Sequence, residues 1–244
     1  MQLTRRQTLK AVLGGVAVGL VHGGSAMAEA NPPITPVASA APPAYRGANQ
    51  VKPLPFDPAK LKGISEKLTT SHYQNNYGGA VKRLNLIQQQ LGALPKDVAP
   101  YQLGALKREE LIATNSMILH EFYFANLGGD GKASGAIVPL LAAQYGSPEV
   151  WEQEFRLTGL SLAGGSGWVV LNFNPRERAV HTYWAADHTQ NLAWGTPLLV
   201  MDMYEHAYQM DYGANAKAYV DAFFQNINWA AVNRRAERAA AAPA

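Results

Sequence analysis

The chain has 244 residues, of which 48% are hydrophobic and 16% charged, and this composition excludes an intrinsically disordered protein. The absence of cysteine from the sequence excludes disulfide scaffolds, thiolate metal sites, iron–sulfur clusters and cysteine nucleophiles. The formal net charge of +3 arises from Arg5, Arg6 and Lys10, because the residues after 28 hold 18 basic and 18 acidic side chains. We therefore expect no basic patch and no nucleic-acid partner.

Residues 1–30 have the pattern of a signal peptide. A basic start is followed by the uncharged stretch Ala11–Val21, and small residues surround two possible cleavage sites, at Ala28 and Ala30. Eleven residues are too few to cross a bilayer, so we expect no stable membrane insertion after processing. Thr4–Lys10 resembles a twin-arginine export motif, with Thr8 where an aromatic residue is more usual. A general secretory signal is the alternative, and either signal predicts a periplasmic or otherwise exported bacterial protein.

Helical patterns come first along the rest of the chain, after a Pro- and Ala-rich spacer at residues 31–50. Ser65 is placed to cap a helix that runs into the eighties, and Gly78-Gly79 is expected to interrupt it. A second helix is predicted over residues 106–127, and Ser147-Pro148 marks the start of a third.

Period-two patterns follow and indicate strands at residues 168–173 and 179–184, with a third, continuously apolar strand at 197–201. Helices are expected again from about 205 and over 217–226. The order of these patterns predicts an α+β protein. Its expected parts are a helical domain at 51–130, an α/β domain at 131–236, and a disordered tail at 237–244.

Histidines in aromatic surroundings are the candidates for chemistry. His72 and His120 lie within predicted helices, and Asp202 precedes His206 by four residues directly after a predicted strand. Taken alone, Asp202 and His206 fit a helix cap and a hydrogen-bonded core histidine better than they fit a metal site. Two helices and one corner, however, can bring three imidazoles and one carboxylate together. That ligand set suits iron or manganese, and ligand type alone leaves zinc open.

Several collinear motifs resemble the iron/manganese superoxide dismutase family over roughly residues 51–236. His72 matches the family's first ligand histidine, and the motif that contains Asp202 and His206 is the most specific of the group. The motifs that carry the resemblance are Lys52-Pro53-Leu54-Pro55-Phe56, Leu119-His120-Glu121-Phe122-Tyr123-Phe124, Gly165-Ser166-Gly167-Trp168, Asp202-Met203-Tyr204-Glu205-His206-Ala207-Tyr208 and Asn226-Ile227-Asn228-Trp229.

The resemblance implies an N-terminal helical hairpin and a C-terminal α/β domain with a three-stranded antiparallel sheet. It also implies one iron or manganese ion per subunit, bound by His72, His120, Asp202 and His206. That ion would cycle between two oxidation states and convert superoxide to oxygen and hydrogen peroxide.

Other family positions suggest the residues around the metal. In the family, the donor that tunes the metal-bound solvent is usually a glutamine from one of two places. Ser116 occupies the first place and is too short, and His188 falls in the second, where some members carry histidine, so we assign this role to His188. The family's Trp168 is kept. Tyr77 is a candidate to lend a hydroxyl to proton delivery, because Ala80 stands where the family has a tyrosine, and we expect a wider, wetter opening there.

Some departures fall where subunits meet in the family. Glu205, which in the family reaches the partner's ligand histidine, is present and predicts a homodimer or higher homo-oligomer. Asn76 and Gln209 replace a histidine and a tyrosine that touch across that dimer, and we expect them to pair as amides. Tyr204 replaces a tryptophan.

Two rival functions remain open from the sequence. The first is a non-enzymatic or weakly active metal-binding relative with the same fold. The second is a zinc hydrolase, which lacks a free general base because Glu205 is assigned to the subunit interface.

Overall fold

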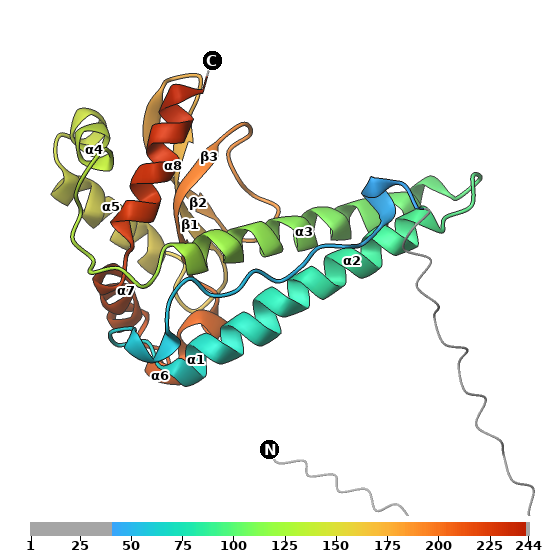
Figure 1. The fold of residues 1–244 in the computed structure, drawn as a ribbon, viewed down its shortest axis with the longest axis horizontal. Helices are drawn as coiled ribbons and strands as arrows, with labels where there is room; N and C mark the ends of the chain where they lie inside the picture. Colours follow the sequence, from blue (N-terminus) through green and yellow to red (C-terminus); the bar gives the residue numbers. More distant parts are fainter. Residues whose placement is uncertain (1–40, 243–244) are drawn as a thin grey trace, which may run out of the picture. The chain divides into compact units, whose positions relative to one another are not determined.

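The computed structural model describes residues 41–242 (Figure 1). The predicted signal peptide at 1–30 and the first part of the spacer, 31–40, lie outside the described residues. Within the described part, helices come first and a three-stranded sheet follows, which confirms the predicted α+β class.

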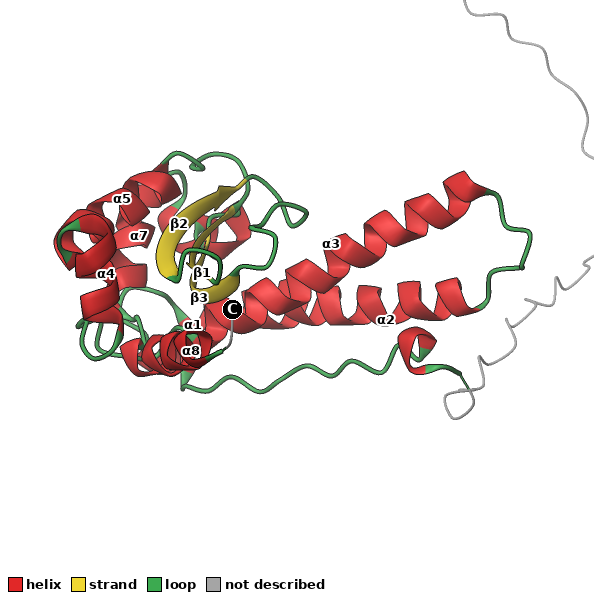
Figure 2. Cartoon of the chain, turned by 90° about the horizontal axis from the view of Figure 1, so that it is seen from above, coloured by secondary structure: helices red, strands yellow, loops and turns green. Residues whose placement is uncertain are grey.

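The N-terminal helices form a hairpin whose two long arms, α2 and α3, lie side by side (Figure 2). The first arm consists of α1 (Glu66–Ser71), a π-helical segment (His72–Tyr77) and α2 (Gly78–Gly92). As predicted, Ser65 caps its start: the Ser65 hydroxyl accepts a hydrogen bond from the Leu68 N–H at 3.0 Å.

The predicted interruption at Gly78-Gly79 is wrong. Both glycines are helical and belong to α2, and the irregular stretch is the π-helical segment before them. The helical cost of a glycine is only about 1 kcal/mol, and packing against a neighbouring helix overrides it. π-Helical turns concentrate at functional sites, and this one begins at His72.

The second arm is α3 (Pro100–Ala125), which starts six residues earlier than the sequence pattern indicated. Pro100 stands in its first turn, where a proline loses no helical hydrogen bond. The C-terminal half of α3 lies against strand β3 (Thr196–Asp202), so the hairpin and the sheet share one continuous core.

The sheet has the order β2-β1-β3, with β1 (Trp168–Asn174) antiparallel to both β2 (Ala179–Ala185) and β3. All three strands match the predicted segments. The register places Trp168 opposite Ala185 on one side and Asp202 on the other. The first residue of β1 is therefore the neighbour of a candidate metal ligand.

Helices pack around the sheet, with α4 (Ile137–Tyr145), α5 (Pro148–Leu160) and α7 (Ala216–Gln225) on the side away from the hairpin (Figure 2). The Ser147 side chain caps α5 as predicted. The sequence patterns missed α4. The helix expected from 205 is one 3-10 turn (Glu205–Ala207) followed by the short α6 (Gln209–Tyr212).

The predicted disordered tail at 237–244 is wrong for its first half, because α8 (Trp229–Ala241) continues through it. Ala236 and Ala239 are buried on the inner side of this helix. Arg178 donates hydrogen bonds to the carbonyls of Ala240 and Ala242, which satisfies the helix end.

The described end of the predicted spacer also has a place in the fold. Asn49 donates from its main-chain N–H and its side chain to the Asn85 side-chain oxygen, at 2.8 Å in both cases. Asn85 in turn donates to the Asn49 carbonyl at 2.9 Å. Residues near 49 are thereby fixed to α2 rather than free of the domain. Among residues 41–242, none of the helices has the length and apolar character that crossing a membrane requires.

Candidate metal centre

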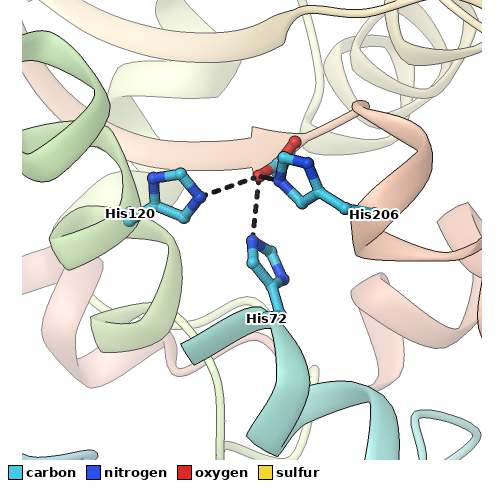
Figure 3. A group of neighbouring side chains, drawn as sticks. His72, His120 and His206 are labelled. Atoms are coloured by element: carbon cyan, nitrogen blue, oxygen red, sulfur yellow. Dashed lines mark hydrogen bonds and ion pairs between the residues drawn. The ribbon is translucent and has the colours of Figure 1, made fainter. Parts of the chain in front are cut away.

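Four side chains from separate parts of the chain meet between the hairpin and the sheet (Figure 3). His72 begins the π-helical segment, His120 lies near the C-terminal end of α3, Asp202 ends β3, and His206 lies in the 3-10 turn. Their candidate ligand atoms all lie within 4.8 Å of one another. We call these four residues the ligand cluster; they are the four that the sequence resemblance selected.

The Asp202 carboxylate stands at the centre of the cluster. Its Oδ2 atom is 3.1 Å from Nε2 of His72 and of His206, and 3.6 Å from Nε2 of His120. Three imidazole nitrogens therefore converge on one carboxylate oxygen from different elements.

The hydrogen bonds of His120 leave one nitrogen free for a metal. Its Nδ1 lies 2.6 Å from the Ser116 main-chain oxygen, which only accepts, so the ring proton is on Nδ1. The Nε2 atom then carries a lone pair, and among the described residues this buried atom has no hydrogen-bond partner. A buried lone pair aimed into a group of two imidazoles and a carboxylate fits a bound metal ion. The residues present thus fit one first-row metal with three nitrogen ligands and one oxygen ligand.

Burial and charge keep His72, His120 and Asp202 in the protonation states that a metal needs, whereas His206 is shifted toward its protonated form. Burial lowers the pKa of His72, and it lowers the pKa of His120 to about 3, so both rings are neutral at pH 7. Burial opposes ionisation of Asp202, but the neighbouring His206 and His72 outweigh it and hold the carboxyl pKa well below its usual range. For His206, burial lowers the pKa and the Asp202 charge raises it, with a net increase.

Groups behind the cluster hold Asp202 in place. The Tyr204 N–H donates to Asp202 Oδ1 at 2.8 Å, and the Tyr219 hydroxyl donates to the Asp202 carbonyl at 2.7 Å. The hydroxyls of Tyr219 and Tyr123 are 3.3 Å apart. Hydrogen bonds of this kind orient metal-binding carboxylates. The sequence patterns did not identify Tyr123 or Tyr219, although each occurs four residues from an aromatic or apolar core position on a helix.

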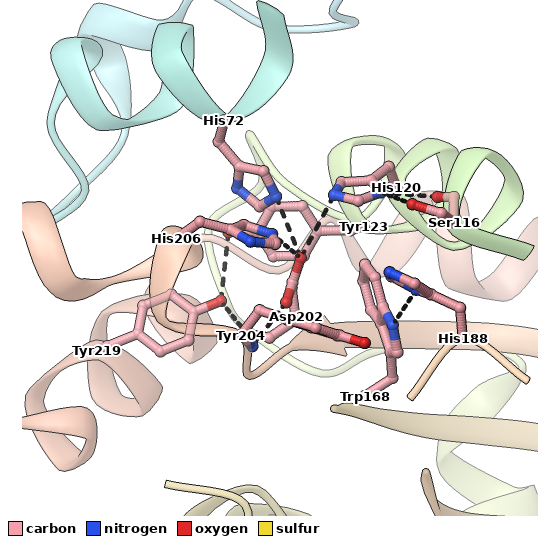
Figure 4. Close-up of polar contacts among 10 residues, drawn as sticks. All are labelled: His72, Ser116, His120, Tyr123, Trp168, His188, Asp202, Tyr204, His206 and Tyr219. Atoms are coloured by element: carbon pink, nitrogen blue, oxygen red, sulfur yellow. Dashed lines mark hydrogen bonds and ion pairs between the residues drawn. The ribbon is translucent and has the colours of Figure 1, made fainter. Parts of the chain in front are cut away.

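His188 lies beside the cluster, where the sequence resemblance placed it (Figure 4). The Trp168 indole N–H donates to His188 Nδ1 at 2.9 Å, and the ring centroids of His188 and His120 are 6.4 Å apart. Tyr204 stacks between two histidines, 4.9 Å from the His188 ring and 5.3 Å from the His206 ring. In Figure 4 the second nitrogen of His188 is turned toward the side on which His120 and Asp202 lie.

Tyr77 has a different environment from the one expected. Its ring lies 6.4 Å from that of His120, but its hydroxyl accepts from the Lys52 N–H at 2.8 Å and donates to Glu121 at 3.1 Å. Glu121 also forms an ion pair with the Lys52 ammonium. The Tyr77 hydroxyl is therefore committed to a bond network at the N-terminal segment, and proton delivery by this hydroxyl is not supported.

The residues expected at the substrate opening and at the subunit interface differ in their solvent exposure. Ala80 is only 8% exposed, so the wide, wet opening predicted at this position is wrong for the described chain. Glu205 and Gln209 are exposed, and Asn76 is half-buried. Within the described chain, the Glu205 side chain has no hydrogen bond or ion pair, which leaves it available to another subunit.

A sheet-backed cluster of three imidazoles and one carboxylate, with an indole-bound histidine beside it, defines a protein with a mononuclear metal site. Residues 133–235 match the family model described as iron/manganese superoxide dismutases, C-terminal domain. The chain is 57% identical over 194 residues to an iron superoxide dismutase of Cupriavidus metallidurans. The aligned region covers 79% of this chain and 97% of that protein.

More distant relatives include both metals. An iron superoxide dismutase of Aquifex aeolicus is 32% identical, with 79% of this chain and 94% of that protein covered. A manganese superoxide dismutase of Halobacterium salinarum is 30% identical, with 78% and 96% covered. The chain belongs to the iron/manganese superoxide dismutase family, and it is an oxidoreductase that acts on superoxide.

Proposed function

We propose that this chain is an exported, homodimeric superoxide dismutase that uses iron. Two superoxide anions and two protons give one molecule of oxygen and one of hydrogen peroxide. The observation that carries the proposal is the ligand cluster, whose Nε2 and carboxylate atoms lie within 4.8 Å of one another.

His72, His120, Asp202 and His206 would hold the metal. A metal bound there would supply one-electron redox chemistry between two superoxide anions, while these residues hold it in place. The ligands themselves balance charge: three neutral imidazoles and one carboxylate leave a divalent or trivalent ion with net positive charge, which attracts an anionic substrate.

His188 contributes a hydrogen-bond donor next to the cluster. The Trp168 indole only donates, so His188 Nδ1 must accept and the proton of the neutral ring lies on Nε2. Burial lowers the His188 pKa, which keeps the ring neutral at pH 7. This Nε2–H is turned toward the ligand cluster (Figure 4). A donor there stabilises a bound solvent molecule or anion and shifts the reduction potential of the metal.

Iron is the favoured metal because the relative with 57% identity is named as an iron enzyme. Because that relative is an enzyme, catalysis is favoured over a non-enzymatic role. The zinc-hydrolase alternative loses support, since the relatives are superoxide dismutases named for iron or manganese.

Export rests on the pattern of residues 1–30, and dimerisation on the exposed Glu205 beside the ligand His206. A protein that collects its metal before export is suited to a twin-arginine route, which carries folded cargo.

Reconstitution with single metals tests the proposal. Metal-free protein is loaded separately with iron, manganese and zinc, and superoxide consumption is measured at equal metal content. We expect turnover with iron and none with zinc. Turnover with manganese alone would contradict the choice of iron, and turnover with neither redox metal would favour the non-enzymatic relative.

A further inference from the structure

We propose that Asn115 is a positioning residue that fixes His188 relative to the ligand cluster. This inference rests on the proposed role of His188 as the hydrogen-bond donor beside the metal. Asn115 lies on α3, five residues before His120 and next to Ser116, at a place to which the sequence patterns assigned nothing.

The contact between Asn115 and His188 is direct. The Asn115 amide donates from Nδ2 to the His188 main-chain oxygen at 2.6 Å, across 73 residues of sequence. Trp168 fixes the His188 ring at Nδ1, and Asn115 fixes its main chain. These two contacts from different elements define where the remaining nitrogen points.

The loop that carries His188 needs such an anchor. It connects β2 and β3, and Trp194 near its end has φ of +62°, a conformation that is strained for a bulky residue. Bonds inside the loop are short-range: Ala186 N–H donates to Gln190 at 2.8 Å, and Thr189 N–H donates to Asp187 at 2.6 Å. They shape the loop, and the bonds that reach it from Ser166 to the Ala186 carbonyl and from Asn172 to Asn191 do not involve His188.

Two neighbouring residues of α3 thereby help to position two histidines, His120 and His188. Ser116 accepts from His120 and orients a metal ligand, while Asn115 holds His188. Because both residues belong to one helix, α3 contributes to the positions of both imidazoles, whose centroids are 6.4 Å apart, while Trp168 of β1 fixes the His188 ring. The Asn115 amide is uncharged, so any effect of removing it on the metal reaches the metal through His188 and not through a change in field.

The reduction potential of the metal-loaded protein reports this geometry independently of turnover. It is measured for the unchanged protein, Asn115→Ala, His188→Ala, the double variant and Gln190→Ala as a control. Gln190→Ala removes a bond within the same loop that does not involve His188. Asn115→Leu, which keeps the side-chain size, is a second variant if alanine prevents folding. Metal content is measured for each.

We expect His188→Ala and Asn115→Ala each to change the reduction equilibrium about tenfold or more, which is about 59 mV for a one-electron couple. The double variant should match His188→Ala, because two residues that act through one contact are not additive. Gln190→Ala should keep the original potential.

Two results would overturn the inference while leaving the role of His188 intact. The first is a potential that shifts in His188→Ala but not in either Asn115 variant. The second is an additive double variant, because Asn115 would then act by another route. An unchanged potential in His188→Ala would instead refute the proposed role of His188, and the inference with it.

Discussion

Nδ1 of His120 lies 2.6 Å from the main-chain oxygen of Ser116, and this contact decides which ring nitrogen is left for the metal. A main-chain carbonyl cannot donate, so the proton is placed on Nδ1 whatever residue stands at 116. The Ser116 hydroxyl also lies 3.4 Å from this nitrogen, but the shorter main-chain contact does not depend on the side chain at position 116.

Replacing His206 by alanine should remove the metal and much of the stability that the metal provides. Binding energy at a site formed only by the folded chain adds to folding stability. We expect bound metal to fall to a small fraction of one per chain, and the melting temperature to become insensitive to a chelator. His181→Ala is the matched control, since His181 pairs with Glu177 near the surface, away from the cluster. A His206→Ala protein that keeps stoichiometric metal would contradict the ligand assignment.

Metal-free protein should lose stability as the pH falls from 7 to 5. The folded-state pKa values of His72 and His120 are lowered, the latter to about 3, so the unfolded chain binds more protons below pH 6.5. Each of the two can lower the free energy of unfolding by up to about 1.4 kcal/mol per pH unit. His206 works in the opposite direction, because its pKa is raised and its protonation stabilises the folded state.

Asp202 does not contribute to this window. Its pKa is held low, so the stability it provides is present above the unfolded value of about 3.9 and is lost only at more acidic pH. Thermal melts of the metal-free protein at pH 5, 6 and 7 measure the slope, and His181→Ala should leave it unchanged. If stability rises toward pH 5 instead, the stabilisation from protonating His206 exceeds the destabilisation from His72 and His120.

Replacing Tyr77 by phenylalanine should lower stability but not turnover. The variant loses the bonds of the hydroxyl to Lys52 and Glu121, and the lost bonds cost about 1–3 kcal/mol. Urea unfolding and superoxide turnover at low and high substrate separate the two effects. The control is Asn85→Ala, which removes a hydrogen bond between α2 and the same N-terminal segment, at Asn49. Slower turnover at high superoxide with unchanged stability would restore the proton-delivery role of Tyr77.

Replacing Glu205 by alanine should shift the protein from dimer toward monomer. Glu205 is exposed and directly precedes His206. In the proposed dimer it would bind the partner's ligand histidine, so the variant would lose that bond in both halves of a symmetric interface. Sedimentation at micromolar concentration gives the oligomeric state, with Glu66→Ala as a control at another exposed acidic position. A protein that is already monomeric before the change would refute the dimer.

We also expect Asn76 to lie near Gln209 of the other subunit at the same interface. Asn76→Leu should weaken the dimer, because Gln209 would then lose its amide partner. Dimer dissociation constants for Asn76→Leu, Gln209→Leu and the double variant measure the pair. Additive effects would show that these residues do not touch across the interface.

The ligand cluster was accessible from the sequence because its motifs are local. Asp202 and His206 are four residues apart, and His72 and His120 stand in short aromatic runs that mark the family. The strands were predictable for a similar reason: Trp168–Phe173 and Ala179–Trp184 have strong β patterns joined by a turn.

Contacts between residues far apart in the sequence could not be predicted from such local motifs. The bond of Tyr77 to Lys52 spans 25 residues, and that of Asn115 to His188 spans 73. No periodicity records them, because each depends on how packed elements face one another. The helical tail was missed for the same reason: burial of Ala239 and capping by Arg178 stabilise a stretch that reads as low-complexity alanine.

Superoxide consumption at known metal occupancy tests the central claim, that the ligand cluster holds one redox metal that dismutates superoxide. Iron-loaded protein is compared with Asp202→Asn, which keeps the size of the side chain but removes the charge at the centre of the cluster. We predict one iron per chain and catalytic turnover in the unchanged protein, with both metal and turnover lost in the variant. One bound iron per chain without turnover, or unchanged turnover in Asp202→Asn, would contradict the claim.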